Sequence, residues 1–189
     1  MPAFLENPAL RSRVAQVSVE TYQRIYERGV ELGNVEMLHG VLFQKKTKSP
    51  LYCWALGSLR AHLEQYLPAD HYVRQGHVLT CGDSEPEPAL AAVRGDPENY
   101  SAAHPTTASL IVEIPIVSEA TARLKLGIYA EAGVPECWLW FVERKIVERC
   151  TQPSNSGYQN VERRTAPATL VSTVFPDVVM FPPELLRDK

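Results

Sequence analysis

Apolar residues recur every three to four positions in three segments of the chain, which predicts three amphipathic helices. These segments cover residues 18–32, 51–67 and 118–132. A serine stands at or just before the start of each segment and is expected to be the helix N-cap: Ser18, Ser49 and Ser118. Gly133 and Pro135 follow the third segment, and such a pair is typical of a helix C-terminus.

Short apolar runs between and after the helices predict β-strands. The runs cover residues 35–38, 41–43, 72–78, 89–93, 110–117, 137–142, 146–150, 158–163, 170–174 and 178–181. The last of them is expected to extend the same sheet as the others. This order of helices and strands favours an α/β or α+β domain in which helices flank a mixed β-sheet.

One of these runs, Leu110–Val117, is apolar except for the carboxylate of Glu113. A continuous apolar run of this length predicts a strand that is buried on both faces. An ionised carboxylate in such a strand is costly, so Glu113 should be protonated, paired with a cation or bound to a metal ion. The alternative is that Glu113 stands at the end of the strand and reaches water or an arginine.

The chain has 189 residues and a mass of 21.1 kDa. This length favours a single domain over residues 1–189 with a sizeable core. The sequence contains neither an apolar run long enough to span a membrane nor the pattern of a signal peptide. It therefore predicts a cytoplasmic protein with no membrane partner. The four cysteines and five histidines lack zinc-ligand spacing, and the cysteines are expected to be reduced.

The formal net charge of −3 and the pI near 6.0 argue against nucleic-acid binding through a broad basic surface. Small basic clusters occur at Lys45, Lys46 and Lys48 and at Arg163 and Arg164. We interpret them as solvated loops or hairpins rather than a phosphate-binding track. The sequence also lacks the glycine-rich motifs of Rossmann and P-loop proteins and the motifs of serine hydrolases and zincins.

The candidate catalytic residues are Glu36, Glu113 and Lys125. Glu36 stands between apolar residues of a predicted strand, and Lys125 lies one helical turn before Tyr129 on the same helix face. Two carboxylates on neighbouring strands with a lysine nearby suit a site for a hard cation, in which the ammonium stabilises a nucleophilic water. The alternatives are that Glu36 is an exposed strand residue and that Lys125 is a solvated helix lysine.

Several segments form a series of short motifs. They read Val-Glu-Met-Leu-His-Gly at 35–40, Lys-Ser-Pro-Leu at 48–51, Ser-Glu-Pro-Glu-Pro-Ala-Leu-Ala-Ala-Val-Arg-Gly at 84–95, His-Pro-Thr-Thr at 104–107 and Tyr-Ala-Glu-Ala-Gly-Val-Pro-Glu at 129–136. The series resembles, in the same order, the motifs of the Uma-type restriction-endonuclease family within the PD-(D/E)xK nuclease superfamily. The resemblance covers about residues 15–150, with the C-terminal strands appended.

This resemblance implies a restriction-endonuclease-like core that cleaves DNA with Mg²⁺ or Mn²⁺. The implied metal carboxylates fall on Glu36, position 89 and Glu113, and the implied catalytic lysine on Lys125. Position 89 is Ala89, where the family pattern S-E-P-x-P-D has aspartate, and a methyl group cannot bind a metal ion. Strand alternation would place Glu87 on the same face as Ala89, so Glu87 is a candidate replacement ligand.

Three hypotheses follow. The first is a metal-dependent DNA endonuclease whose site is degraded at Ala89, so that its activity is weak or absent. The second is a non-catalytic protein of the nuclease fold that binds nucleic acid or a protein partner. The third is a structural homodimer in which Glu113 forms a salt bridge with Lys125.

Overall fold

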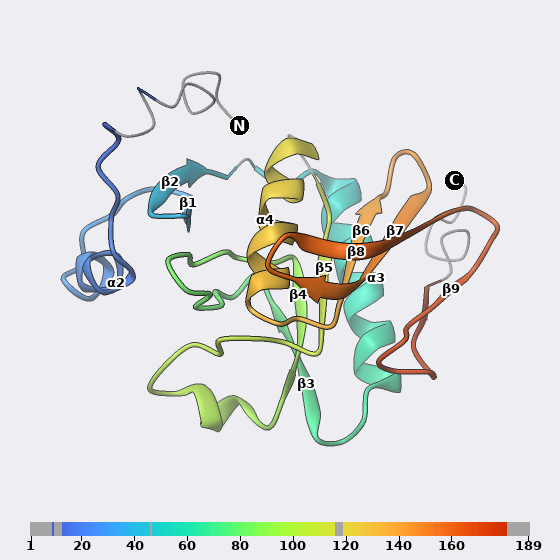
Figure 1. Cartoon of the computed structure of the whole chain (residues 1–189). Coiled ribbons are helices and arrows are strands. Elements are labelled where there is room, and N and C mark those ends of the chain that lie inside the picture. Colours follow the sequence, from blue (N-terminus) through green and yellow to red (C-terminus); the bar gives the residue numbers. More distant parts are fainter. Residues whose placement is uncertain (1–8, 10–12, 46, 116–118, 181–189) are drawn as a thin grey trace.

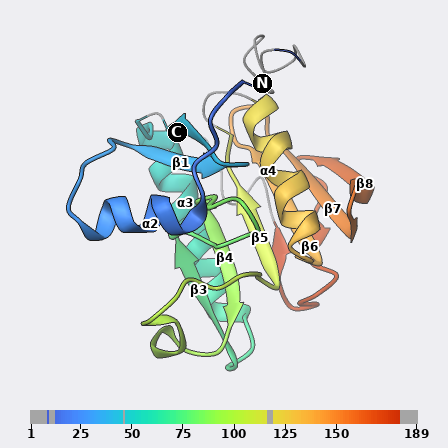
Figure 2. The ribbon, with the colours of Figure 1, turned by 60° about the vertical axis from the view of Figure 1, so that its left-hand side comes forward.

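The computed structural model describes residues 9, 13–45, 47–115 and 119–180 (Figure 1). Its helices are α2 (Val19–Glu27), α3 (Pro50–Tyr66), α4 (Glu119–Glu131) and the short 3-10 helix η2 (Pro97–Tyr100). Helix α3 packs on one face of the main β-sheet and α4 packs on the other (Figures 1 and 2). The molecule is therefore a helix–sheet–helix sandwich with one core on each side of the sheet.

The main sheet has six strands: β3 (His71–Gln75), β4 (Leu90–Arg94), β5 (Leu110–Glu113), β6 (Glu136–Phe141), β7 (Ile146–Ser154) and β8 (Gly157–Thr165). They lie in the order of the chain. Strands β5 and β6 pair in parallel, and α4 makes the crossover between them, while the other neighbouring strands pair antiparallel. The predicted mixed sheet flanked by helices is confirmed.

Two small hairpins stand outside this sheet. The first consists of β1 (Val35–Leu38) and β2 (Val41–Gln44), and the second of β9 (Leu170–Val171) and β10 (Val179–Met180). The expectation that the C-terminal run 178–181 extends the main sheet is therefore wrong over the residues that the structure describes, and Phe181 lies outside them.

Helix α2 ends earlier than the sequence predicts. Ser18 caps it as expected, since its hydroxyl accepts a hydrogen bond from the backbone N–H of Thr21. The helix ends at Glu27 because Gly29 adopts a positive φ of 70°, which breaks the helical path. Val30, which continued the apolar periodicity, is half exposed. Its apolar side chain therefore does not mark a buried helix face.

The central strand is also shorter than the apolar run that predicts it. Strand β5 ends at Glu113, two residues before Pro115, which has no N–H to donate to a neighbouring strand. Residues 116–118, including the expected N-cap Ser118, lie outside the described residues. All residues of β5 are buried, as the sequence predicts, and Glu113 is therefore a buried carboxylate at the end of its strand.

The carboxylate of Glu136, at the first position of β6, holds the chain between β9 and β10 in place. Glu136 is fully buried, and it accepts hydrogen bonds from the Trp138 indole at 2.5 Å and from the Thr173 backbone N–H at 2.6 Å. The hydroxyls of Ser172 and Thr173 donate to the same carboxylate. These contacts turn the segment inward and explain why it does not continue the main sheet.

We expect Glu136→Ala to lower the free energy of unfolding by about 3 kcal/mol or more, because several buried donors lose a charged acceptor. Urea unfolding would measure the loss. Glu64→Ala is the matched control, because Glu64 forms a half-exposed pair with Arg60 and should cost no more than about 0.5 kcal/mol. Equal losses in the two variants would contradict the assigned role of Glu136.

Candidate functional site

Three candidate residues from separate elements meet at one point. Lys125 comes from α4, and its Nζ lies 3.0 Å from Oε2 of Glu36 on β1 and 2.6 Å from Oε1 of Glu113 on β5. The strands β1 and β5 are not neighbours in one sheet, as the sequence interpretation supposed, because β1 belongs to the separate N-terminal hairpin. The carboxylates therefore face each other across the junction between that hairpin and the main sheet.

The cluster is almost completely shielded from solvent. The exposed fraction is 6% for Glu36, 7% for Glu113 and 4% for Lys125. This burial excludes the two plain alternatives, an exposed strand glutamate and a solvated helix lysine. One ammonium between two carboxylates compensates part of the cost of burying these charges.

Main-chain groups and a tyrosine complete the network. The hydroxyl of Tyr129 donates to Oε1 of Glu113 at 2.6 Å, so the predicted common face of Lys125 and Tyr129 does meet Glu113. The loop before β4 contributes through Glu87, whose backbone N–H donates to Glu36 at 3.0 Å. The backbone carbonyl of Glu87 accepts from Lys125 at 2.8 Å. The loop before β4 is thus hydrogen-bonded to both Glu36 and Lys125.

Burial and charge act in opposite directions on the pKa values of this cluster. Burial raises the pKa of Glu113, and this effect outweighs the opposing attraction of Lys125. Burial alone would lower the pKa of Lys125, but the carboxylates of Glu113 and Glu36 more than offset it, so this pKa is raised. The lysine therefore stays protonated, and Glu113 takes up a proton at a higher pH than an ordinary glutamate does.

A cavity of about 170 Å³ opens beside the cluster. Ala89 lines this cavity together with Glu36, Glu113 and Lys125. The position at which the resemblance implies an aspartate therefore lies at the cluster, and it is occupied by an alanine, which has no oxygen ligand.

Glu87 lines the same cavity but lies in a loop and not on a strand, because β4 begins only at Leu90. The alternation argument for Glu87 is therefore wrong, although its backbone comes close to the cluster. Its carboxylate is engaged by Lys45, whose Nζ lies 2.5 Å from Oε2.

Two lysines of the cavity wall were not expected to belong to the site. Lys45 and Lys48 line the cavity, although the sequence interpretation placed them on a solvated loop. Lys48 is exposed and forms no ion pair with the described residues, while its ammonium lies 5.7 Å from the ring centre of Tyr52. The motif Lys-Ser-Pro-Leu at 48–51 could have drawn attention to Lys48, but charge alone could not.

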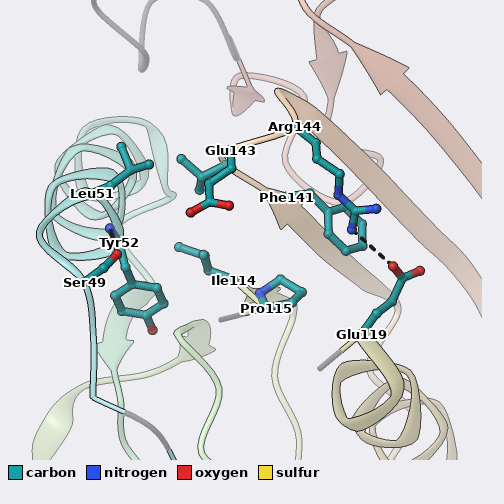
Figure 3. A pocket seen from close by; sticks show the side chains of 10 residues that line it. Ser49, Leu51, Tyr52, Ile114, Pro115, Glu119, Phe141, Glu143 and Arg144 are labelled. Atoms are coloured by element: carbon teal, nitrogen blue, oxygen red, sulfur yellow. Dashed lines mark hydrogen bonds and ion pairs between the residues drawn. The ribbon is translucent and has the colours of Figure 1, made fainter. Parts of the chain in front are cut away.

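A second cavity, of about 270 Å³, adjoins the first and shares Tyr52, Ile114 and Pro115 with it (Figure 3). Its cation is Arg144, which lies 4.1 Å above the ring of Phe141. The guanidinium is also paired with the carboxylate of Glu119 at 3.1 Å. This second cavity is therefore lined by aromatic and aliphatic side chains, and its arginine is already paired with a carboxylate.

The donor set does not fit a resident divalent metal ion. Mg²⁺ and Mn²⁺ require several oxygen ligands, and within the described part of the chain no group of three or more His, Cys, Asp or Glu side chains is placed to hold a metal ion. The carboxylates of Glu36 and Glu113 already share the ammonium of Lys125. The methyl group of Ala89 supplies no further ligand.

Comparisons with known proteins agree with this fold. The model of the family Uma2, described as "Putative restriction endonuclease", matches residues 19–184, which is most of the chain. A crystal structure described as a "putative nuclease belonging to DUF820" from Anabaena variabilis is similar, with a TM-score of 0.73 and 14% sequence identity. The similarity covers 89% of this chain and 97% of that one. None of the curated proteins compared with the chain matches it.

In the described residues, no helix is both long enough and apolar enough to cross a membrane.

We expect Lys125→Met to lower the free energy of unfolding by about 3–5 kcal/mol near neutral pH, because two buried carboxylates lose their cation. Without the ammonium, the pKa of Glu113 should rise further. A raised native pKa adds stability that is fully present below the unfolded pKa of about 4.3 and is lost as the pH rises through the native pKa. The variant should therefore regain stability on acidification.

Urea unfolding of Lys125→Met at about pH 8 and about pH 5 would measure this recovery. The surface variant Arg24→Met, which removes an exposed pair with Glu20, is the control and should show little loss at either pH. The same large loss for Lys125→Met at both pH values would show that Glu113 is not the group that takes up the proton.

Proposed function

We propose a function for this chain, which belongs to the Uma2 family, described as "Putative restriction endonuclease". The chain binds DNA through a degraded endonuclease site, and it cleaves phosphodiesters weakly or not at all. The observation that carries this proposal is the place of Ala89. Ala89 lines the cavity of the Glu36–Glu113–Lys125 cluster, at the position where the resemblance implies a central aspartate ligand. The fold of the family is retained, but the set of oxygen ligands is incomplete.

Charge balance supports the same conclusion. With Lys125 protonated and both glutamates ionised, the cluster has a charge of −1, and an aspartate at position 89 would bring this to −2. A divalent cation entering the present cluster would also be repelled by the ammonium that both carboxylates already share. Weak metal binding is therefore expected, and weak stabilisation of transition-state charge with it.

Binding of a phosphate group does not need the lost ligand. Lys45, Lys48 and Lys125 all line the cavity, and Lys48 forms no ion pair with the residues that the structure describes. An ammonium at the cavity mouth can pair with a backbone phosphate of DNA. The geometry therefore favours binding more than it favours hydrolysis.

A second candidate function is an active endonuclease in which Glu87 replaces the missing aspartate. The supporting observation is that Glu87 lines the cavity and that its carboxylate is held by Lys45. If a DNA phosphate drew Lys45 away, the carboxylate of Glu87 would be released next to Glu36. Loss of cleavage in a Glu87→Gln variant would identify this arrangement.

We expect Ala89→Asp to increase nicking of supercoiled plasmid DNA about 100-fold or more over the chain as it stands, assayed with Mg²⁺ or Mn²⁺. A metal ion that is properly held contributes several kcal/mol to transition-state stabilisation, and each 1.36 kcal/mol is about tenfold in rate. Ala89→Asn is the matched control, because it has a similar size but no charge and should not restore cleavage.

Ala89→Asp combined with Glu113→Gln should be inactive, since Glu113 is the carboxylate that the main sheet contributes to this cavity. Efficient nicking by the unmodified chain, abolished by both Glu113→Gln and Glu87→Gln, would contradict the proposal and establish the second candidate function. Circular dichroism of each variant would verify that the fold is kept.

A further inference from the structure

A larger cavity, of about 740 Å³, lies between α2, the first hairpin and the loop that follows η2. It adjoins the cavity beside the Glu36–Glu113–Lys125 cluster. The two cavities share the side chains of Lys45 and Glu87. We call this larger space the tyrosine groove, after the residues that distinguish it: Tyr22, Tyr26 and Tyr100. A ligand lying in one cavity can therefore continue into the other past Lys45.

We propose that the tyrosine groove binds an unpaired nucleobase, so that the chain prefers single-stranded to duplex DNA. This inference rests on the proposed function, because it takes nucleic acid as the ligand of the adjoining cavity. It adds the form of the nucleic acid: a phosphate lies near Lys45 and Lys48 while its base enters the groove.

The tyrosines offer a prepared stacking surface. Tyr26 is 44% exposed, whereas its neighbour Tyr22 is buried, with 4% exposed. The two rings meet edge to face with centroids 5.0 Å apart, and their hydroxyls are hydrogen-bonded at 3.3 Å. Because Tyr22 fixes Tyr26, little side-chain freedom remains to be lost when a base stacks on the exposed ring. Stacking on aromatic side chains is tolerant of sequence, since every base has a π-face.

The polar wall of the groove is rich in hydrogen-bond acceptors. Glu85 lines the groove with 2% of its surface exposed, and its Oε1 accepts from Gln23 and from the hydroxyl of Thr80 at 2.9 Å. Glu27, which is exposed, adds a carboxylate that a ligand can reach to the same lining. The N–H groups on the edge of a base are donors that match such a wall, and they are free only when the base is unpaired.

Charge argues against duplex binding at this place. The groove contains Glu27, Glu85 and Glu87 against the single lysine Lys45, and the whole chain has a formal charge of −3. Binding that tracks two phosphate backbones needs many basic contacts, which these residues do not supply. Stacking of an unpaired base needs no such charge, so a single strand can bind here with only the phosphate contacts at Lys45 and Lys48.

The test is fluorescence anisotropy with a labelled single-stranded oligonucleotide and with its duplex, in buffer that contains a chelator of divalent metals. We expect the single strand to bind more tightly and Tyr26→Ala to raise its Kd roughly tenfold. Tyr26→Phe keeps the ring and should bind like the unmodified chain. Tyr66→Ala is the matched control, because Tyr66 on α3 is 41% exposed but does not line the groove, and it should leave Kd unchanged.

Equal affinity for single strand and duplex, or an unchanged Kd for Tyr26→Ala, would overturn the inference. Preference of the groove for an arginine-rich peptide over the oligonucleotide would overturn it as well, since the acidic side chains would then be the recognition element. The proposed function is tested separately by plasmid nicking with Ala89→Asp. A variant that nicks duplex DNA while Tyr26→Ala binds normally would keep the proposed function and remove only this inference.

Discussion

The contact between the Lys125 ammonium and two buried carboxylates joins parts of the molecule that the main sheet alone does not hold together. Helix α4 supplies the lysine, β5 supplies Glu113, and the separate first hairpin supplies Glu36. The backbone of Glu87 closes the network from the loop before β4. Because a buried charge without a partner is so costly, these elements are constrained to meet at this point.

This requirement for charge compensation links the stability of the chain to its function. A site that binds a divalent ion must offer carboxylates to that ion, whereas here the ammonium already lies within hydrogen-bonding distance of both glutamates. At position 89, which lines the same cavity, alanine adds no negative charge. We therefore propose that the scaffold and its internal cation remain while the metal affinity is weak, and that Lys48, which forms no ion pair with the described residues, binds phosphate. That residues 1–189 form a single domain remains a prediction from the sequence. That the chain forms a homodimer also remains a prediction.

The sequence predicts local features well and long-range partners poorly. Helical periodicity and the buried run around Glu113 follow from near neighbours, and the structure has the mixed sheet flanked by helices that they indicate. The motif order predicted that Glu36 and Lys125 belong with Glu113, but not that Glu36 stands on a hairpin outside the sheet. The sequence does not predict the role of Glu136, because most of its donors lie far along the chain, at residues 172–174. The apolar side chain of Val30 also extends the predicted helix too far, because Val30 is half exposed and lies beyond the end of α2.

We propose that the cluster of Glu36, Glu113 and Lys125 is partly neutralised by its own lysine and has little affinity for a divalent cation. Titration of the unmodified chain with Mn²⁺, followed by electron paramagnetic resonance of the free ion, tests this most directly. We expect Mn²⁺ to bind no more tightly than a Kd of about 1 mM, which corresponds to about −4 kcal/mol, and we expect the same Kd for Glu113→Gln. Binding at micromolar concentration that disappears in Glu113→Gln would contradict it, because Glu36 and Glu113 would then form a working metal site despite Ala89.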